Sequence, residues 1–526
     1  MKTAKFLAVA ALVAGLAAPA LEAKTLRWSS QGDITTLDPH SNNEGFNNSY
    51  LDNVYEPLVT RGKNLAIEPC LALSWEYVNP TTLRVKLRPN VRFHDGSPFG
   101  ADDVVFTIER ALSDTSNFKT YLTGVKGAKK VDDLTADILT EGPVPVLIPQ
   151  LTEVRIMSKA WSTKHNILKP QNYMAKEETF SSRNANGTGP YIVRSREADV
   201  KTVAVANSNW WGKREGNVDE IVYLPIKQDS TRIAALLSGE IDFILDPPVQ
   251  DIPRLKQPGS STKVIEGNEN RTIFLGMDQH RDELLYSNVK GKNPFKDKRV
   301  REAMLAAIDL NAIKTQVMRG LSIPTAVMFA PQVNGYPKDI DVVKKPDREK
   351  AKKLLADAGY PQGFEVTLDC PNNRYISDEK ICVAVAGMLA QVGVKVKVNA
   401  MPRTTWLPKI NNRDTSFYML GWGVPTFDSQ YALQSLIRTV VPKTADGDYN
   451  CGNYSNPKID ALIDRLKTEV DAKKRGEIAR EVTQLHMADV GHIPLHFQVI
   501  PWAMRSNVNV VHRADNRLTI KWVKIQ

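Results

Sequence analysis

One β-α-β pattern constrains the fold of this chain more than any other feature of its sequence. Residues 364–368 (FEVTL) alternate as a strand does, residues 377–392 have a helical pattern that stops at Gly393, and a second strand follows. A crossover of this kind is right-handed, and it belongs to a sheet that helices cover. The chain is therefore predicted to fold around a mixed α/β sheet.

Other stretches extend the same mixed α/β pattern along the chain. Residues 82–112 are predicted to form two strands that turn at Asp95-Gly96, followed by a helix with Asp102 and Asp103 in its first turn, where acidic groups suit the helix dipole. Further elements are expected as strands at 187–212, a helix and strand at 229–244, and a helix at 345–360. No repeat or low-complexity linker separates them, so we expect domains joined by short strands within one compact body.

The first 23 residues have the pattern of a secretory signal. A basic start precedes an apolar run over residues 6–18, which is too short to span a bilayer, and small residues follow it. Cleavage after Ala20 and cleavage after Ala23 both fit. Since no cysteine lies near either point, we expect no lipid anchor and a mature protein that is free in solution.

Charge gives little indication of a macromolecular partner. The formal net charge is +10, but the densest basic stretch, residues 344–353, also contains Asp347 and Glu349 and is typical of a solvated helix face. Basic and aromatic residues do not alternate as a stacking platform for nucleic acid requires, so no nucleic-acid partner is expected.

Four cysteines are too few for a disulfide scaffold, and they lack the spacing of zinc or redox sites. Cys370 and Cys382 could pair in an oxidising compartment or remain buried thiols; the sequence leaves both possibilities open.

Motifs for catalysis are missing. The chain has no H-E-x-x-H, Walker, G-x-G-x-x-G or G-x-S-x-G sequence, which argues against the common hydrolases and nucleotide-binding enzymes. His486, His492 and His496 are close in sequence, but Pro494 breaks the helical spacing that would place two imidazoles on one face. We expect structural histidines there, with no metal, no cofactor and no enzymatic activity.

Seven blocks resemble a known family in their order along the chain. They are ITTLDPH (34–40), NVYEPLVT (53–60), LRPNVRFHDGSPFGADDVVFTIERA (87–111), GTGPYIV (187–193), IAALLSGEIDF (233–243), NPFKDKRVREAMLAAID (293–309) and YSNPKIDALID (454–464). On these the chain resembles the peptide/nickel family (family 5) of periplasmic solute-binding proteins, the receptors of ABC importers.

The resemblance implies a two-lobed α/β clamp of the cluster C type with a central ligand cleft. Lobe I would comprise residues 24–272 and 496–526, with an extra subdomain at about 56–180, and lobe II residues 273–495. Two strands would cross between the lobes near residues 270 and 495. The protein would act as a monomer that delivers a small molecule or short peptide to an inner-membrane permease and its ATPase subunits.

The same resemblance points to ligand-binding residues. A strand over Phe417–Leu420 should turn at Gly421-Trp422-Gly423 and present the Trp422 ring to the cleft; a core tryptophan is the alternative. Arg374 aligns with the arginine that binds the substrate carboxylate in dipeptide-binding relatives, although an arginine in a surface ion pair would look the same in sequence.

One position departs from the dipeptide-binding pattern. Pro425 stands where those relatives carry the aspartate that binds the peptide amino group. Asp428 could replace that aspartate or could cap a helix. In residues 41–50, Asn42, Asn43 and Phe46 could also face the cleft, or the asparagines could serve in turns.

We therefore expect a receptor for a peptide or a peptide-like polar solute. The alternatives are a binding protein for an opine, an oligosaccharide, glutathione, nickel or haem, and a secreted enzyme on the same fold.

Overall fold

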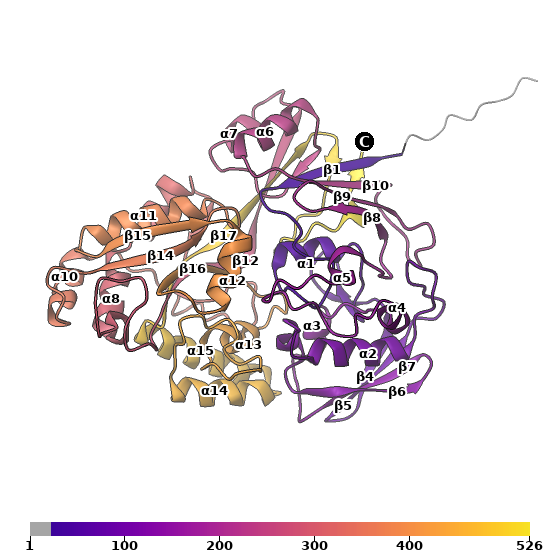
Figure 1. Ribbon diagram of the computed structural model, residues 1–526, viewed down its shortest axis with the longest axis horizontal. Helices are drawn as coiled ribbons and strands as arrows, with labels where there is room; N and C mark the ends of the chain where they lie inside the picture. Colours follow the sequence, from indigo (N-terminus) through magenta and orange to yellow (C-terminus); the bar gives the residue numbers. More distant parts are fainter. Residues whose placement is uncertain (1–22) are drawn as a thin grey trace, which may run out of the picture.

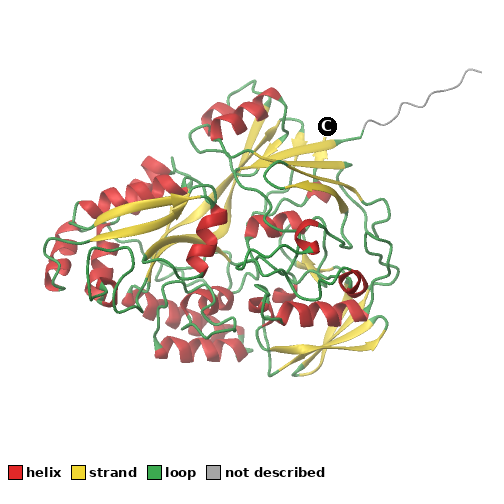
Figure 2. Cartoon of the chain, in the orientation of Figure 1, coloured by secondary structure: helices red, strands yellow, loops and turns green. Residues whose placement is uncertain are grey.

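A computed structural model describes residues 23–526, so the expected signal segment lies almost entirely outside the described part of the chain. Within that part, no helix is both long and apolar enough to cross a membrane. Figure 1 shows two lobes side by side with long strands running between them, and Figure 2 shows helices around the sheets of both.

An 11-stranded sheet links the lobes, and its centre is a pair of long antiparallel strands. These are β12 (Thr262–Met277) and β17 (His492–Arg505), which cover the two positions where crossing strands were predicted. Their register shifts between Asn268 and Thr272. Beyond this shift β12 also pairs with β16 (Phe417–Gly423), so one half of β12 belongs to each lobe.

The remaining strands extend the sheet outward from this central pair. Lobe II continues from β16 with β14 (Glu365–Pro371) and β15 (Lys395–Met401), while β13 (Ser322–Pro324) pairs with β17. Lobe I continues from β17 with β11 (Phe243–Ile244), β1 (Thr25–Ser30), β10 (Glu220–Pro225), β9 (Lys201–Ala206) and β8 (Tyr191–Glu197). Strands from the beginning, the middle and the end of the chain thus belong to one sheet.

The predicted β-α-β crossover is confirmed. Strands β14 and β15 are parallel neighbours, and α11 (Asp378–Ala390) connects them. Ile381, Val385 and Leu389 recur at helical spacing and are buried. Gly393, which was predicted to stop the helix, has a φ of +92°, a conformation that residues with a Cβ rarely adopt.

A separate four-stranded sheet forms the outer part of lobe I, in the order β4 (Ala72–Asn79), β5 (Thr82–Leu87), β7 (Thr135–Thr140) and β6 (Val125–Asp132). Helix α2 (Ala101–Leu112) lies against it (Figure 1). Strand β5 and helix α2 were predicted, but the strand expected between them does not form. Only one bridge joins Arg92 and Pro98, and the alternation there reflects burial of Phe93 and Phe99 around a tight turn.

The remaining helices and strands complete the lobes. Lobe I has α1 (Gly45–Leu51), α3 (Leu147–Leu151), α4 (Lys159–Lys164), α5 (Phe180–Arg183), α6 (Asp229–Ser238), α7 (Ile252–Leu255), and the strand pairs β2 (Val59–Arg61) with β3 (Ile67–Pro69) and β18 (Val508–Asn509) with β19 (Lys524–Ile525). Lobe II has α8 (Lys298–Ala307), α9 (Leu310–Ala312), α10 (Arg348–Asp357), α12 (Arg403–Asn411), α13 (Ser429–Ala432), α14 (Pro457–Thr468) and α15 (Ala472–Asp489).

Candidate functional site

A cavity of about 70 Å³ lies between the two lobes, where the crossing strands meet. Lobe I contributes Asn43, Glu44 and Tyr121, and lobe II contributes Arg374, Trp422 and Tyr431. The predicted residues Asn43, Arg374 and Trp422 therefore come together. Phe46 lies in an adjoining hollow, which shares Arg271 and Arg374 with the main cavity.

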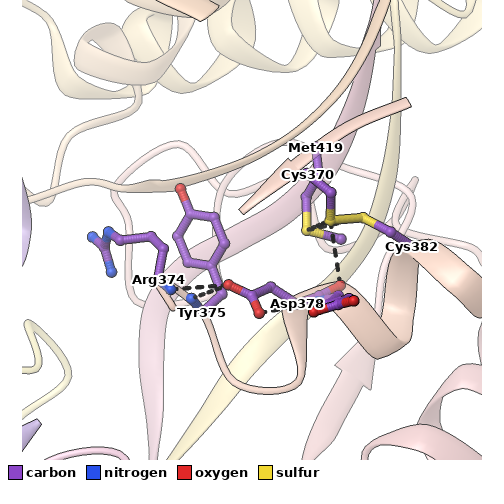
Figure 3. Close-up of a disulfide and its surroundings, with 7 residues drawn as sticks. Cys370, Arg374, Tyr375, Asp378, Cys382 and Met419 are labelled. Atoms are coloured by element: carbon purple, nitrogen blue, oxygen red, sulfur yellow. Dashed lines mark hydrogen bonds between the residues drawn. A yellow bond between two sulfur atoms is a disulfide. The ribbon is translucent and has the colours of Figure 1, made fainter. Parts of the chain in front are cut away.

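Arg374 sits on the loop between β14 and α11, where a ligand-binding residue was predicted. Figure 3 shows how Asp378 holds this loop: one carboxylate oxygen accepts the backbone N–H of Arg374 at 2.9 Å and that of Tyr375 at 3.0 Å. The same loop is closed by a disulfide between Cys370 and Cys382, so the pairing that the sequence left open is present. The Arg374 guanidinium lies over the Tyr375 ring, 4.8 Å from its centroid.

Glu44 is the acidic group that faces Arg374 from the other lobe. Its carboxylate lies 2.6 Å from Arg374 and 3.0 Å from Arg403, and it also caps α1 through the N–H groups of Phe46 and Asn47. Burial alone would raise the pKa of Glu44, but the charges of the two arginines outweigh it and lower the pKa to about 2. Glu44 thus joins the lobes as an anion.

Arg271, which sequence reasoning missed, is a second guanidinium in the cavity. It lies on β12 opposite Gly423, and it donates to Glu269 at 3.1 Å and to the carbonyl of Gly421 at 3.1 Å. Its Nη2 atom makes no hydrogen bond to another described residue. The sequence offered one signal for Arg271: it is a basic residue in a segment that was predicted to cross between the lobes.

The predicted turn at Gly421-Trp422-Gly423 is wrong, because β16 continues straight through all three residues. The glycines serve close packing instead. A Cβ on Gly421 would lie 2.6 Å from Ile273 and 2.7 Å from the Tyr375 ring, and one on Gly423 would lie 3.2 Å from Arg271. Trp422 lines the cavity from the end of a strand.

Aromatic rings form one wall of the cavity. Trp422 stacks on Tyr431 with 5.3 Å between ring centroids and contacts Tyr449 at 4.5 Å, while Tyr431 stacks on Tyr121 of lobe I. The Trp422 indole N–H is buried and has no hydrogen-bond partner among the described residues. Buried indole donors usually find a partner, so this donor is available to a ligand acceptor.

Asp428 does not line the cavity. It caps α13 by accepting the N–H of Gln430 at 3.0 Å and pairs with Arg475 at 2.7 Å, which is the capping role that the sequence left as an alternative. Pro425 lines the cavity, and its carbonyl accepts a hydrogen bond from Arg61 of lobe I at 3.2 Å. Asn42 bonds to Thr35 within lobe I.

The three C-terminal histidines are buried away from this cavity. His486 and His492 form a hydrogen bond of 2.9 Å, and burial lowers the pKa of His492 and His496 to about 3. Among the described residues, no cluster of three or more His, Cys, Asp or Glu side chains has the geometry to hold a metal ion.

Comparisons with known proteins agree with this geometry. The model of bacterial extracellular solute-binding proteins, family 5 Middle, matches residues 66–440. The glutathione-binding protein GsiB of Pectobacterium atrosepticum is 29% identical over 486 residues, which cover 90% of this chain and 88% of that protein.

Solved structures share the fold over nearly the whole chain. The DppA binding protein of Helicobacter pylori with the peptide STSA has a TM-score of 0.83 at 22% identity and covers 96% of this chain and 98% of its own. MoaA of A. tumefaciens R10 with mannopinic acid has a TM-score of 0.84 at 22% identity and covers 96% and 100%. With a family match over most of its length and a cleft between two lobes, this chain belongs to the family 5 bacterial extracellular solute-binding proteins.

Proposed function

We propose that this ABC-importer receptor captures a small peptide-like solute with a free carboxylate in the cleft between its lobes. The observation that carries the proposal is the position of Arg374. Its loop is held by Asp378 and closed by the disulfide, and its guanidinium reaches the cavity with Nε and Nη1 making no hydrogen bond to another described residue. A preorganised guanidinium suits a carboxylate, to which it can donate two parallel hydrogen bonds.

Arg271 supports the proposal because it provides a second cation in the same cavity. Its unpaired Nη2 atom packs closely against the backbone of Gly45 and Gly423, where a Cβ would lie only 3.0 and 3.2 Å from it. Two guanidinium groups suit a ligand with more than one carboxylate, such as the glutathione bound by the GsiB relative. The aromatic wall at Trp422 would cover an apolar part of the same ligand.

An opine is the second candidate ligand, and the presence of Pro425 in place of an aspartate supports it. Peptide binders of this family that hold the amino terminus use an aspartate at this position, whereas here a backbone carbonyl bonded to Arg61 replaces it. The neighbour MoaA is described with mannopinic acid, a solute that is not a peptide.

The proposal also covers the leader, the boundary between the lobes and the release of the ligand. The leader would be cleaved after Ala20 or Ala23 without lipid attachment, leaving the protein in the periplasm. The boundary between lobes would fall at residues 272/273 in β12 and 495/496 in β17, close to the register shift. The ligand would leave unchanged, because binding alone shifts the clamp between its open and closed states.

Calorimetric titration of ligand-free protein with glutathione and short peptides tests the proposal. Arg374→Ala should weaken the binding of any carboxylate ligand by about 2 to 5 kcal/mol, since the ligand charge would be left buried and unpaired. Arg348→Ala is a matched control, because Arg348 is an exposed arginine of the same lobe without an ion pair among the described residues. Equal affinities in both variants would remove Arg374 from the site. Altered ligand after incubation would instead support an enzyme.

A further inference from the structure

We propose that Glu44 and Arg374 together recognise an α-amino-acid head group, in which an ammonium and a carboxylate share one carbon atom. This inference rests on the proposed function and narrows its ligand class. Peptides linked through a γ-glutamyl side chain and opines with a free secondary amine, such as mannopinic acid, carry such a head group. An ordinary peptide separates its amino and carboxyl ends along the chain.

The two oxygens of Glu44 have different partners. Oε2 lies 3.0 Å from Arg403 and accepts the N–H of Asn47 at 3.0 Å. Oε1 lies 2.6 Å from Arg374 and accepts the N–H of Phe46 at 3.2 Å. Both arginines belong to lobe II, but Arg403 also donates to the carbonyl of Asp33 in lobe I, whereas the Arg374 guanidinium has no other hydrogen-bond or ion-pair partner among the described residues. The contact between Oε1 and Arg374 is therefore the one that can be exchanged for a ligand.

Arg374 can also exchange its ion-pair partner, Glu44, for a group of the ligand. Its only ion pair among the described residues is the one with Glu44, and its side chain is 12% exposed. The loop beneath it does not depend on that pair, because Asp378 holds the backbone N–H groups of Arg374 and Tyr375. If Glu44 and Arg374 moved apart, the other contacts of each residue would thus still hold it beside the cavity.

A zwitterionic head group fits between these two charges. Its ammonium can take the place of Arg374 on Oε1 of Glu44, while its carboxylate takes the place of Glu44 on Arg374. The ligand then connects lobe I to lobe II through both of its charges, which favours closure as the direct ion pair does. Arg403 stays on Oε2, so Glu44 remains an anion.

An ordinary peptide cannot satisfy both groups at once. Each residue of an extended chain adds about 3.3 to 3.6 Å, so its amino and carboxyl ends lie too far apart to bind groups in direct contact. A peptide that bound only one of them would leave either Arg374 without an anion or Oε1 of Glu44 without a cation, and an incompletely paired buried charge is costly. The missing aspartate at Pro425 fits this interpretation, since Glu44 would bind the ammonium from the opposite lobe.

Two isomeric tripeptides provide a matched test. γ-Glutamyl-alanyl-glycine and α-glutamyl-alanyl-glycine have the same atoms and formal charge, and both lack a thiol that could attack the disulfide. In calorimetric titrations of the ligand-free protein, the γ-linked isomer should bind at least about tenfold more tightly. In Glu44→Gln, which keeps an oxygen for the α1 cap but loses the charge, the preference should fall to within about threefold. Glu349→Gln, at an exposed glutamate of lobe II, should keep the wild-type preference.

The wild-type ratio decides the inference even if Glu44→Gln folds poorly. Equal binding of the isomers, or tighter binding of the α-linked one, would overturn the inference. So would binding of alanyl-alanine with neither tripeptide bound, and in both cases the receptor function would stand. If neither the tripeptides nor alanyl-alanine bind, the proposed peptide-like ligand fails and the inference fails with it.

Discussion

Tyr121 and Tyr431 stack across the cleft with their ring centroids 5.1 Å apart and their planes inclined by 6°. Their hydroxyl groups lie within 2.9 Å, and Tyr431 also accepts a hydrogen bond from Asn43 at 3.1 Å. The two tyrosines belong to opposite lobes. Together with the Glu44–Arg374 ion pair, they provide contacts that exist only while the lobes are closed. A ligand bound between Glu44 and Arg374 would replace that ion pair and leave the stacked tyrosines in contact.

Tyr431→Phe should weaken ligand binding by about 1 kcal/mol, because it removes hydrogen bonds made only in the closed state. The change should appear as a severalfold rise in the calorimetric Kd, with little change in the thermal unfolding midpoint. Tyr360→Phe, at a lobe II tyrosine whose hydroxyl has no hydrogen bond to another described residue, is the control. Equal losses in both variants would contradict a cross-lobe role.

Trp422→Phe should weaken ligand binding by about 1 kcal/mol, since it shortens the aromatic wall and removes the unpaired indole N–H. Trp161→Phe is matched for burial, because Trp161 and Trp422 are both 7% exposed, and Trp161 lies outside the cavity. Both variants should lose comparable stability on thermal unfolding, but only Trp422→Phe should lose affinity. A loss of stability alone would assign Trp422 to the core.

Helices and strands that have a clear residue periodicity of their own could be predicted from the sequence. The β14–α11–β15 crossover was predictable because Ile381, Val385 and Leu389 repeat at helical spacing between two apolar strands. The strand expected after β5 was wrong because alternate burial in a tight turn gives the same period as a strand. The turn expected at Gly421 was wrong because the reason for glycine there is the Tyr375 ring, which is distant in sequence.

The site was predictable only in part. Arg374 and Trp422 could be placed through their positions in family motifs. Glu44 could not, since its importance comes from Arg374 and Arg403, which are more than 300 residues away in the other lobe. Arg271 was missed although it lies where a crossing strand was predicted, because its hydrogen bond to Gly421 depends on the pairing of β12 with β16. For Asp428, sequence offered a cap and a ligand contact equally, and the choice depends on Arg475, whose side chain reaches it from another helix.

Removal of the disulfide should destabilise the protein and loosen the loop that carries Arg374. For a loop of this size, loss of the cross-link costs about 3 kcal/mol through the entropy of the unfolded chain. The double variant Cys370→Ala, Cys382→Ala should unfold at lower urea concentration than the oxidised wild type. A reductant should shift the wild type toward the variant and leave the variant unchanged. Identical midpoints for the wild type with and without reductant would contradict a cross-link in the folded protein.

Asp378 should make stability depend on pH. Burial raises its pKa from 3.8 to about 7, despite backbone N–H donors that lower it. Between these values the folded protein holds a proton that the unfolded chain releases, so the contribution of Asp378 to the free energy of unfolding falls as pH rises. Relative to Asp378→Asn, the wild type should lose up to about 1.4 kcal/mol per pH unit across this window. A difference between the two proteins that is independent of pH would contradict the raised pKa.

Mass spectrometry of the small molecules released on denaturing protein purified natively from the periplasm tests the central claim most directly. The account predicts one solute that carries a free carboxylate, present in wild-type protein and depleted in Arg374→Ala. A γ-glutamyl compound or an opine would also match the pairing of Glu44 with Arg374. A solute without a carboxylate, or equal retention of the solute by both proteins, would contradict the proposed mode of capture.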